Sequence, residues 1–212
     1  MGRRDVERFL MGGKDPGLNA YHPEKKIQYK DRMPEEHSAE YRLALSDLIK
    51  AAKVSEKKMA HSYRNFNVGC ALFAYDEENN EYEVYNAGNW KYEPGTQEGN
   101  DQRCAERNTL DGATKDQCSV VVGMVIVCEQ TQKDSTSGVN STVLTPCSKC
   151  RKMLRESPLI KPDTIITMIN PKPDRSVEDG GAGEEGYEEW IEEMTVAELL
   201  ARHGEEYPTT KV

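Results

Sequence analysis

In the first half of the chain, the spacing of apolar residues is first that of a helix and then that of strands. Residues 38–60 place apolar side chains on one helical face and predict an amphipathic helix capped by Ser38; these side chains are Tyr41, Leu45, Leu48, Ile49 and Ala52. Residues 67–75 form an apolar run, and residues 81–88 alternate between apolar and polar side chains. The polar turn between the two runs predicts an antiparallel hairpin.

The second half alternates helical segments with apolar runs. Residues 104–115, 146–156 and 196–203 are predicted helices, and the last has a capping box at its start and a glycine after its end. Residues 119–128 and 163–169 are nearly all apolar, as in strands that are covered on both faces. This order of elements predicts an α/β fold, namely a three-layer α/β/α sandwich with a mixed central sheet.

Polar stretches flank or interrupt the predicted domain, which we place at residues 38–203. Residues 1–37 mix glycine, proline and charged residues, and we interpret them as an N-terminal arm that is poorly ordered or faces a partner. Residues 171–189 form an acidic insertion rich in glycine and proline, which is either solvated or a docking surface. Residues 204–212 are a C-terminal tail, and the long polar loop at 89–103 has the length of loops that are functional or mobile.

Composition and charge indicate which kinds of partner the protein could bind and in which cellular compartment we expect it. The chain has 212 residues, a net charge of −9, a pI of about 5.1 and a mean hydropathy of −0.79. Binding to nucleic acid is disfavoured, because it needs a basic face that can hold phosphates. We expect neither a membrane span nor a secretory signal, since no apolar run is long enough and none stands near the start. Six cysteines are few for a disulfide framework at this length, which favours a reducing, cytoplasmic location.

Three of the cysteines occur in two short motifs, each at the start of a predicted helix. Cys104 opens one helix, and a Pro-Cys-x-x-Cys motif containing Cys147 and Cys150 opens another. Backbone N–H groups at a helix start and the positive end of the helix dipole favour thiolates. Three thiolates supply three of the four tetrahedral ligands of zinc and leave one position for water, as in a catalytic site. The sequence therefore predicts Zn²⁺ as the cofactor.

Glu106 lies two residues after the first of these cysteines and is the predicted catalytic residue. A carboxylate at this spacing can reach a water molecule on the metal without being a ligand itself. It can then accept a proton from the water and pass it to a leaving amine. Together the two motifs match the zinc deaminase signature, in which His or Cys precedes the Glu and Pro-Cys-x-x-Cys follows downstream.

Two other interpretations of the cysteines stay open. A closed structural zinc site needs a fourth ligand, and His61 is the only histidine near the central elements. A redox pair at Cys147 and Cys150 leaves Cys104 and Glu106 without a role. The other cysteines lie in or beside predicted strands and are expected to be buried as small apolar residues; they are Cys70, Cys118 and Cys128.

Segments throughout residues 38–203 resemble the small homotetrameric cytidine deaminases of the three-cysteine zinc type. They occur in the family's order and are SYRNFNVGCAL (62–72), Gly88-Asn89, Cys104-Ala105-Glu106-Arg107, PCSKCR (146–151) and MTVAELL (194–200). The resemblance implies a hydrolase of pyrimidine salvage that converts cytidine or deoxycytidine to uridine or deoxyuridine and releases ammonia. It also implies a small nucleoside as the substrate and a homotetramer as the assembly.

The resemblance implies roles for further residues. Phe66 would pack against the pyrimidine, Asn89 would hold the sugar hydroxyl, and the backbone of Ala105 would contact the base carbonyl. Arg107 would hydrogen-bond a zinc thiolate and offset the net negative charge of three thiolates on Zn²⁺. The chain departs from the family at Lys91, which stands in place of a sugar-binding glutamate and cannot accept a hydrogen bond from a hydroxyl.

This departure keeps alternative functions open. The substrate could be another cytosine compound, such as a nucleoside antibiotic of the blasticidin S type, a nucleotide or the free base. Nucleic-acid editors use the same zinc chemistry, but they generally have histidine as the first ligand. A zinc-stabilised binding module without turnover is the non-enzymatic alternative, and the intact Glu106 argues against it.

Overall fold

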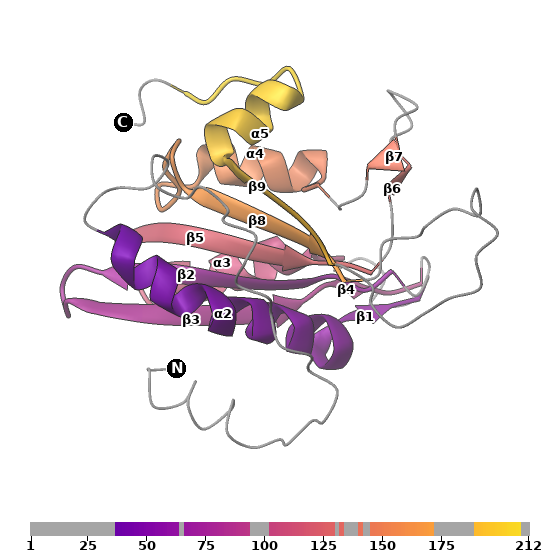
Figure 1. Ribbon diagram of the computed structural model, residues 1–212, viewed down its shortest axis with the longest axis horizontal. Helices are drawn as coiled ribbons and strands as arrows, with labels where there is room; N and C mark the ends of the chain where they lie inside the picture. Colours follow the sequence, from indigo (N-terminus) through magenta and orange to yellow (C-terminus); the bar gives the residue numbers. More distant parts are fainter. Residues whose placement is uncertain are drawn as a thin grey trace.

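A five-stranded mixed sheet forms the centre of the computed structural model, in the strand order β3-β2-β5-β8-β9 (Figure 1). The structure describes residues 37–63, 66–93, 102–129, 132–133, 140–141, 145–171 and 189–208. The strands are β2 (Gly69–Asp76), β3 (Glu81–Gly88), β5 (Val120–Val127), β8 (Ile165–Asn170) and β9 (Trp190–Thr195). Only the central pair, β5 and β8, is parallel, and the other neighbours in this sheet are antiparallel.

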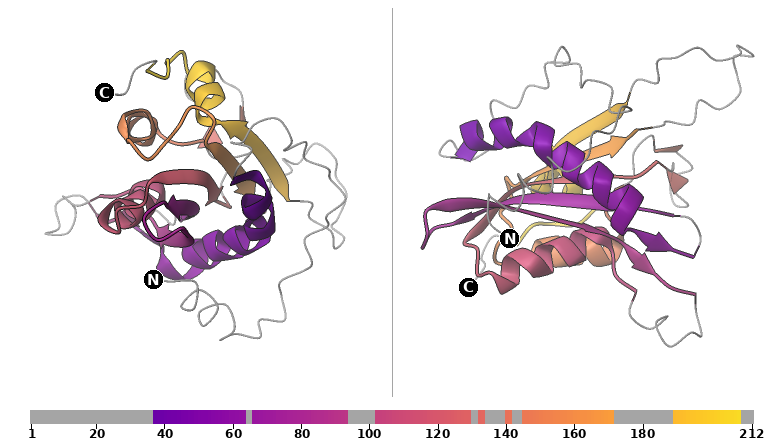
Figure 2. Two further views of the ribbon diagram at one scale, coloured as in Figure 1. Left: turned by 90° about the vertical axis from the view of Figure 1, so that its left-hand side faces the viewer. Right: turned by 90° about the horizontal axis from the view of Figure 1, so that it is seen from below.

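Helices cover both faces of this sheet (Figure 2). On one face lies α2 (Ser38–Val54), which continues directly into a short π-helix, η2 (Ser55–Met59). On the other face lie α3 (Ala105–Lys115), α4 (Ser148–Glu156) and α5 (Val196–Arg202). The expected three-layer α/β/α sandwich is therefore confirmed.

Two apolar clusters, one on each face, hold the layers together. Along β5, Val125 and Val127 pack in the cluster that contains α2. Met124 and Ile126 point the opposite way, into the cluster that contains α3, α4 and α5. Successive side chains of a strand alternate between its faces, so a strand covered on both sides must be apolar throughout. This is why the run at 119–128 predicted a central strand.

The fifth strand of the sheet, β9, was not expected from the sequence. Its segment contains Glu192 and Glu193, which interrupt the apolar pattern, and it follows the acidic stretch directly. In the structure β9 pairs along its whole length with β8, and Met194 is buried against the α5 side of the sheet. Pairing with a buried neighbour thus decides the conformation that the local pattern leaves open.

Two further pairs of two-residue strands lie outside the central sheet. β1 (His61–Ser62) pairs parallel with β4 (Trp90–Lys91), and β6 (Gln132–Lys133) pairs antiparallel with β7 (Asn140–Ser141).

The interpretations of residues 1–36, 172–188 and 209–212 as arm, insertion and distal tail concern segments outside the described residues. Across the described ranges, no helix combines the length and the apolar character that a membrane crossing requires.

Gly88 ends β3 where the chain leaving η2 crosses it. A Cβ atom at this position would overlap the backbone nitrogen of Ala60, which cannot swing aside as a side chain would. We expect Gly88→Ala to lower the free energy of unfolding by about 3 kcal/mol in urea denaturation. The comparison variant Gly204→Ala meets no atom and has only a left-handed φ of 68° to strain it. It should lower stability by about 1 kcal/mol, and equal losses would contradict the steric argument.

Candidate metal centre

The sheet brings two helix starts to the same edge. Gly88 pairs with Gly69, and Gly69 pairs with Val127, so β3 and β5 end at the same edge of the sheet, on either side of β2. The chain leaves β3 towards α3 and leaves β5 towards α4, and both helices lie on the same face. Cys104 is the N-cap residue of α3, and Cys147 is the N-cap residue of α4.

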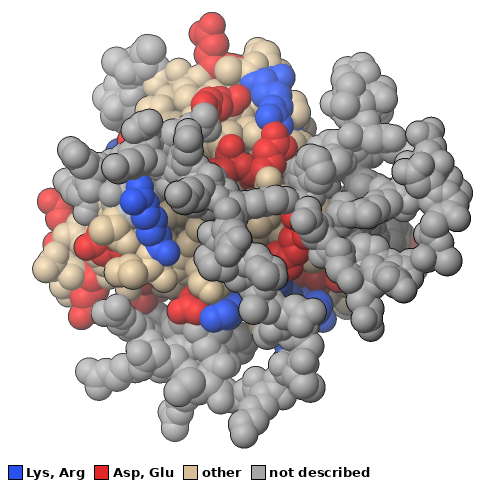
Figure 3. Space-filling model, viewed as in Figure 1, with Lys and Arg blue, Asp and Glu red and all other residues tan. Residues whose placement is uncertain are grey.

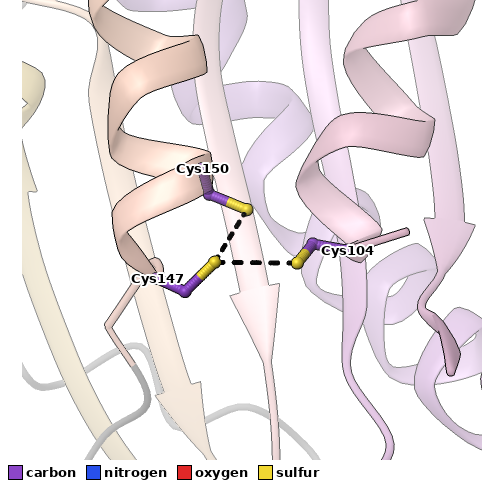
Figure 4. A group of neighbouring side chains, drawn as sticks. All are labelled: Cys104, Cys147 and Cys150. Carbon is purple, nitrogen blue, oxygen red and sulfur yellow. Dashed lines mark hydrogen bonds between the residues drawn. The ribbon is translucent and has the colours of Figure 1, made fainter. Parts of the chain in front are cut away.

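Three cysteine sulfur atoms meet between these helix starts (Figure 4). The Sγ atom of Cys147 lies 3.7 Å from that of Cys104 and 3.5 Å from that of Cys150. All three Sγ atoms lie within 4.8 Å of one another. The structure thus brings together the two motifs that the sequence singled out, and Figure 4 shows the three thiols turned towards a common centre.

The geometry of the three sulfur atoms fits a zinc ion. Zn–S bonds of about 2.3 Å in a tetrahedron place neighbouring sulfur atoms about 3.8 Å apart. The two hydrogen-bonded pairs of sulfur atoms, at 3.5 and 3.7 Å, are already close to that separation. Within the described ranges, no fourth Cys, His, Asp or Glu joins this group. His61, the candidate for a closed site, is not a member of this group, and its ring lies 4.9 Å from that of Tyr92.

The three thiols shift one another's pKa values. Hydrogen bonds with Cys104 and Cys150 lower the pKa of Cys147, and backbone N–H groups of the first turn of α4 act in the same direction. The hydrogen bond with Cys147 raises the pKa of Cys104, and hydrogen bonds with Cys104 and Cys147 raise the pKa of Cys150. The trio alone therefore favours a single thiolate, and a divalent cation supplies the charge that three thiolates need.

Glu106 stands in the first turn of α3 and is only 4% exposed. Burial is the main cause that raises the pKa of its carboxyl group, and the charge of Cys147 also raises it. A hydrogen bond with Cys150 and the charge of Lys91 act in the opposite direction. A buried carboxyl beside the sulfur atoms, with its pKa moved towards neutrality, can both accept and return a proton.

The remaining cysteines lie outside this centre. Cys70, Cys118 and Cys128 are buried, as expected for small apolar residues. All three pack in the apolar cluster on the α3 side of the sheet.

The residues expected to face a substrate lie near the same edge. Phe66 is half-buried and packs against the cluster on the α3 side, and Ala105 is fully buried at the start of α3. Asn89 is only 1% exposed, and its side chain binds the backbone. Its Oδ1 accepts from the Val68 N–H at 2.8 Å, and its Nδ2 donates to the Phe66 carbonyl at 2.8 Å. Asn89 thereby fixes the segment that carries Phe66.

Replacing Asn89 with alanine should measure this fixing role. Asn89→Ala leaves a buried N–H at Val68 and a carbonyl at Phe66 without partners, and we expect a loss of about 3 kcal/mol in the free energy of unfolding. Asn108 is the matched control, since its side chain donates one such bond, to the Gly88 carbonyl at 2.9 Å. Asn108→Ala should lose about 1 kcal/mol in the same urea titration. A smaller loss for Asn89→Ala than for the control would refute the assignment.

Lys91 makes a hydrogen bond to a cysteine of the trio, a contact of the kind expected of Arg107. The Lys91 ammonium donates to Cys104 Sγ at 3.4 Å. Arg107 is exposed at the third position of α3, and the described residues show no hydrogen bond from it to a cysteine. Sequence reasoning noted Lys91 only as a departure. Its spacing from Asn89 was a usable signal, because residues two apart in an extended segment face the same side.

Arg151 is a further residue that sequence reasoning missed. Its Nη1 donates to the Pro146 carbonyl at 2.9 Å, directly before Cys147, and its Nε donates to Glu205 at 2.7 Å. Arg155 adds a second ion pair to Glu205 at 3.6 Å. The described part of the C-terminal tail therefore packs on α4 and supports the turn that carries Cys147.

Comparisons with known proteins give the following matches. A family model of the zinc-binding region of cytidine and deoxycytidylate deaminases matches residues 44–166. Cytidine deaminase of Burkholderia pseudomallei is a similar solved structure, with a TM-score of 0.48 and 21% identity over 73% of this chain and 94% of that chain. Cytidine deaminase of Mycobacterium leprae gives a TM-score of 0.45 and 20% identity over 74% and 96% of the two chains. A search of curated sequences found no significant match.

Proposed function

The chain belongs to the family of cytidine and deoxycytidylate deaminases with a zinc-binding region, and from this premise we propose that it deaminates cytidine or deoxycytidine. The products are uridine or deoxyuridine and ammonia. The observation that supports the proposal best is the buried carboxyl of Glu106 beside three sulfur atoms from two separate motifs. A structural zinc site needs no such carboxyl, whereas a hydrolytic site needs a group that moves protons.

Each residue of the centre has a distinct task in the proposed reaction. Cys104, Cys147 and Cys150 would hold the zinc ion. When bound, zinc would act as a Lewis acid that activates a water molecule for attack on the ring carbon bearing the amino group. Glu106 takes the protons of that water, passing one to N3 of the ring and the other to the leaving amino group. A C–O bond forms, a C–N bond breaks, and ammonia leaves, so that atoms and charge balance.

The segment around Phe66 would complete the pocket on the side of the base. The proposal places the Phe66 ring against the pyrimidine and the backbone of Ala105 against the base carbonyl. Asn89 supports this arrangement through its two bonds to the backbone of residues 66–68. Any contact between Asn89 and a sugar hydroxyl has to use the amide hydrogen and the lone pair that these two bonds leave over.

A second candidate function keeps the reaction and changes the substrate. Lys91 stands where the family has a carboxylate for the sugar, so a nucleotide, the free base or an antibiotic of the blasticidin S type is the alternative. A nucleic-acid editor has less support, since the net charge is −9. On the face in Figure 3, the basic side chains among the described residues lie between acidic ones and form no continuous patch.

A substrate panel tests the proposed function. Zinc-loaded protein is incubated with cytidine, deoxycytidine, deoxycytidine monophosphate, cytosine and blasticidin S, and ammonia release is measured for each. We expect turnover of cytidine and deoxycytidine with the highest kcat/KM. Turnover of another member of the panel alone would favour the second candidate function. Full zinc occupancy without turnover of any member would favour a binding module.

We also propose a cytoplasmic homotetramer that acts in pyrimidine salvage, as the family resemblance and the free cysteines suggest. Exposed apolar side chains near β1 and β4 are available for subunit contacts; they are Met59, Tyr63 and Trp90. Sedimentation velocity of the full chain should give the mass of four subunits, and a monomer at micromolar concentration would contradict the proposed assembly.

A further inference from the structure

Lys91 lies in a segment that is fixed on both sides. Strand β4, which it ends, pairs parallel with β1, and the Tyr63 N–H donates to the Lys91 carbonyl at 2.9 Å. The preceding residue, Trp90, exchanges two backbone hydrogen bonds with Arg103, at 2.9 and 2.8 Å. Arg103 is directly followed by Cys104. The backbone therefore holds Lys91 and the first metal-ligand candidate close together.

The side chain of Lys91 points inward from this segment. Its Nζ donates to Cys104 Sγ at 3.4 Å. The nearby guanidinium groups have other partners, because Arg103 pairs with Asp111 at 2.6 Å and Arg151 pairs with Glu205. Lys91 is thus a basic side chain with a hydrogen bond to a cysteine of the trio.

The charge of the proposed zinc centre favours such a group. Three thiolates around Zn²⁺ carry a net charge of −1, and this excess makes the ion a weaker Lewis acid. An ammonium beside one sulfur brings the sum to zero, and its hydrogen bond withdraws electron density from that sulfur.

We propose that Lys91 is a positioning residue that compensates the charge of the three-cysteine zinc centre through Cys104, an inference that rests on the proposed zinc site. In this role Lys91 faces the metal ligands. The departure from the family at this position then supports the metal, and Lys91 does not bind a phosphate or carboxylate of the substrate.

Metal affinity tests the proposal without any assay of turnover. Zinc binding of Lys91→Met, which keeps the length of the side chain and removes its charge, is measured by competition with a chromophoric chelator at constant pH. We expect a loss of 10- to 100-fold in affinity, the usual effect of removing a group that supports a metal ligand. Lys91→Arg should recover most of this loss. Arg107→Met and the exposed Lys115→Met are matched controls and should stay within about twofold of the unmodified protein.

A spectroscopic readout separates this role from a merely structural one. In the cobalt-substituted protein, loss of a hydrogen bond to sulfur should move the thiolate-to-cobalt charge-transfer band of Lys91→Met to lower energy. Circular dichroism shows whether each variant is folded, and Lys91→Gln repeats the test if the methionine variant is not. Unchanged affinity and an unchanged band in folded Lys91→Met or Lys91→Gln would overturn the inference, as would an effect confined to Arg107→Met.

The same experiment distinguishes this inference from the proposed function. If the unmodified protein binds zinc and deaminates cytidine while the Lys91 variants behave like it, only the role of Lys91 is wrong. If the unmodified protein fails to bind zinc at all, both the inference and the proposed function are wrong.

Discussion

Glu106→Gln should slow deamination at least a hundredfold while the protein keeps its zinc. Glutamine has nearly the same volume as glutamate, so it fits the site in which this side chain is only 4% exposed. It cannot take a proton from water and hand it to the ring nitrogen or the amino group. General acid–base groups contribute about 10²- to 10⁴-fold to a rate, and we expect kcat to fall by that factor.

The design of this test isolates proton transfer. Zinc content is measured on the same sample by elemental analysis and should remain at one ion per chain, because the three sulfur ligands are untouched. Glu77→Gln, an exposed acidic residue in the turn after β2, serves as the matched control and should leave kcat unchanged. If Glu106→Gln retains a tenth or more of the original kcat, this carboxyl is not the proton-transfer group.

Cys147→Ala should remove both the metal and the activity. The Cys147 side chain is exposed, so its truncation leaves no cavity in the core and its effect reports on metal binding. Zinc binding to structural sites is worth about 10–16 kcal/mol, and the share of one ligand corresponds to at least a hundredfold in affinity. We therefore expect substoichiometric zinc after dialysis and no measurable ammonia release.

Cys118→Ala is the matched control for this variant. Cys118 is buried in the core beside Tyr85 and has no place in the sulfur trio. It should lose stability through packing yet retain a full equivalent of zinc. Retention of stoichiometric zinc by Cys147→Ala, or its loss from Cys118→Ala, would exclude the proposed ligand set.

The helices and the central strands were predictable because their apolar residues follow one clear period. The hairpin of β2 and β3 and the strand β5 are cases in which local pattern and tertiary burial agree. Strand β9 was missed because Glu192 and Glu193 occupy positions where a simple pattern expects apolar side chains. Hydrogen bonding to β8 makes this segment a strand, and β8 is too distant in the sequence for a local pattern to include it.

The metal-ligand candidates were predictable for a different reason. A helix start places a cysteine at a defined point, and two such starts were recognisable from their motifs alone. The side chains that surround the three cysteines come from segments distant in the sequence. Position within a motif does not predict which of them contacts a cysteine. Arg107 follows the motif glutamate but points to solvent, whereas Lys91 reaches Cys104 from the end of a two-residue strand.

The bonds of Arg151 give the C-terminal end of the chain a practical importance for any engineered version. Glu205 pairs with the Arg151 guanidinium, which also donates to the Pro146 carbonyl. Two residues after Glu205, the Tyr207 hydroxyl donates to the Ile160 carbonyl at 2.7 Å. A truncation after α5 would leave that guanidinium without its counter-ion, next to the turn that carries Cys147. Any shortened version should therefore retain residues 204–208.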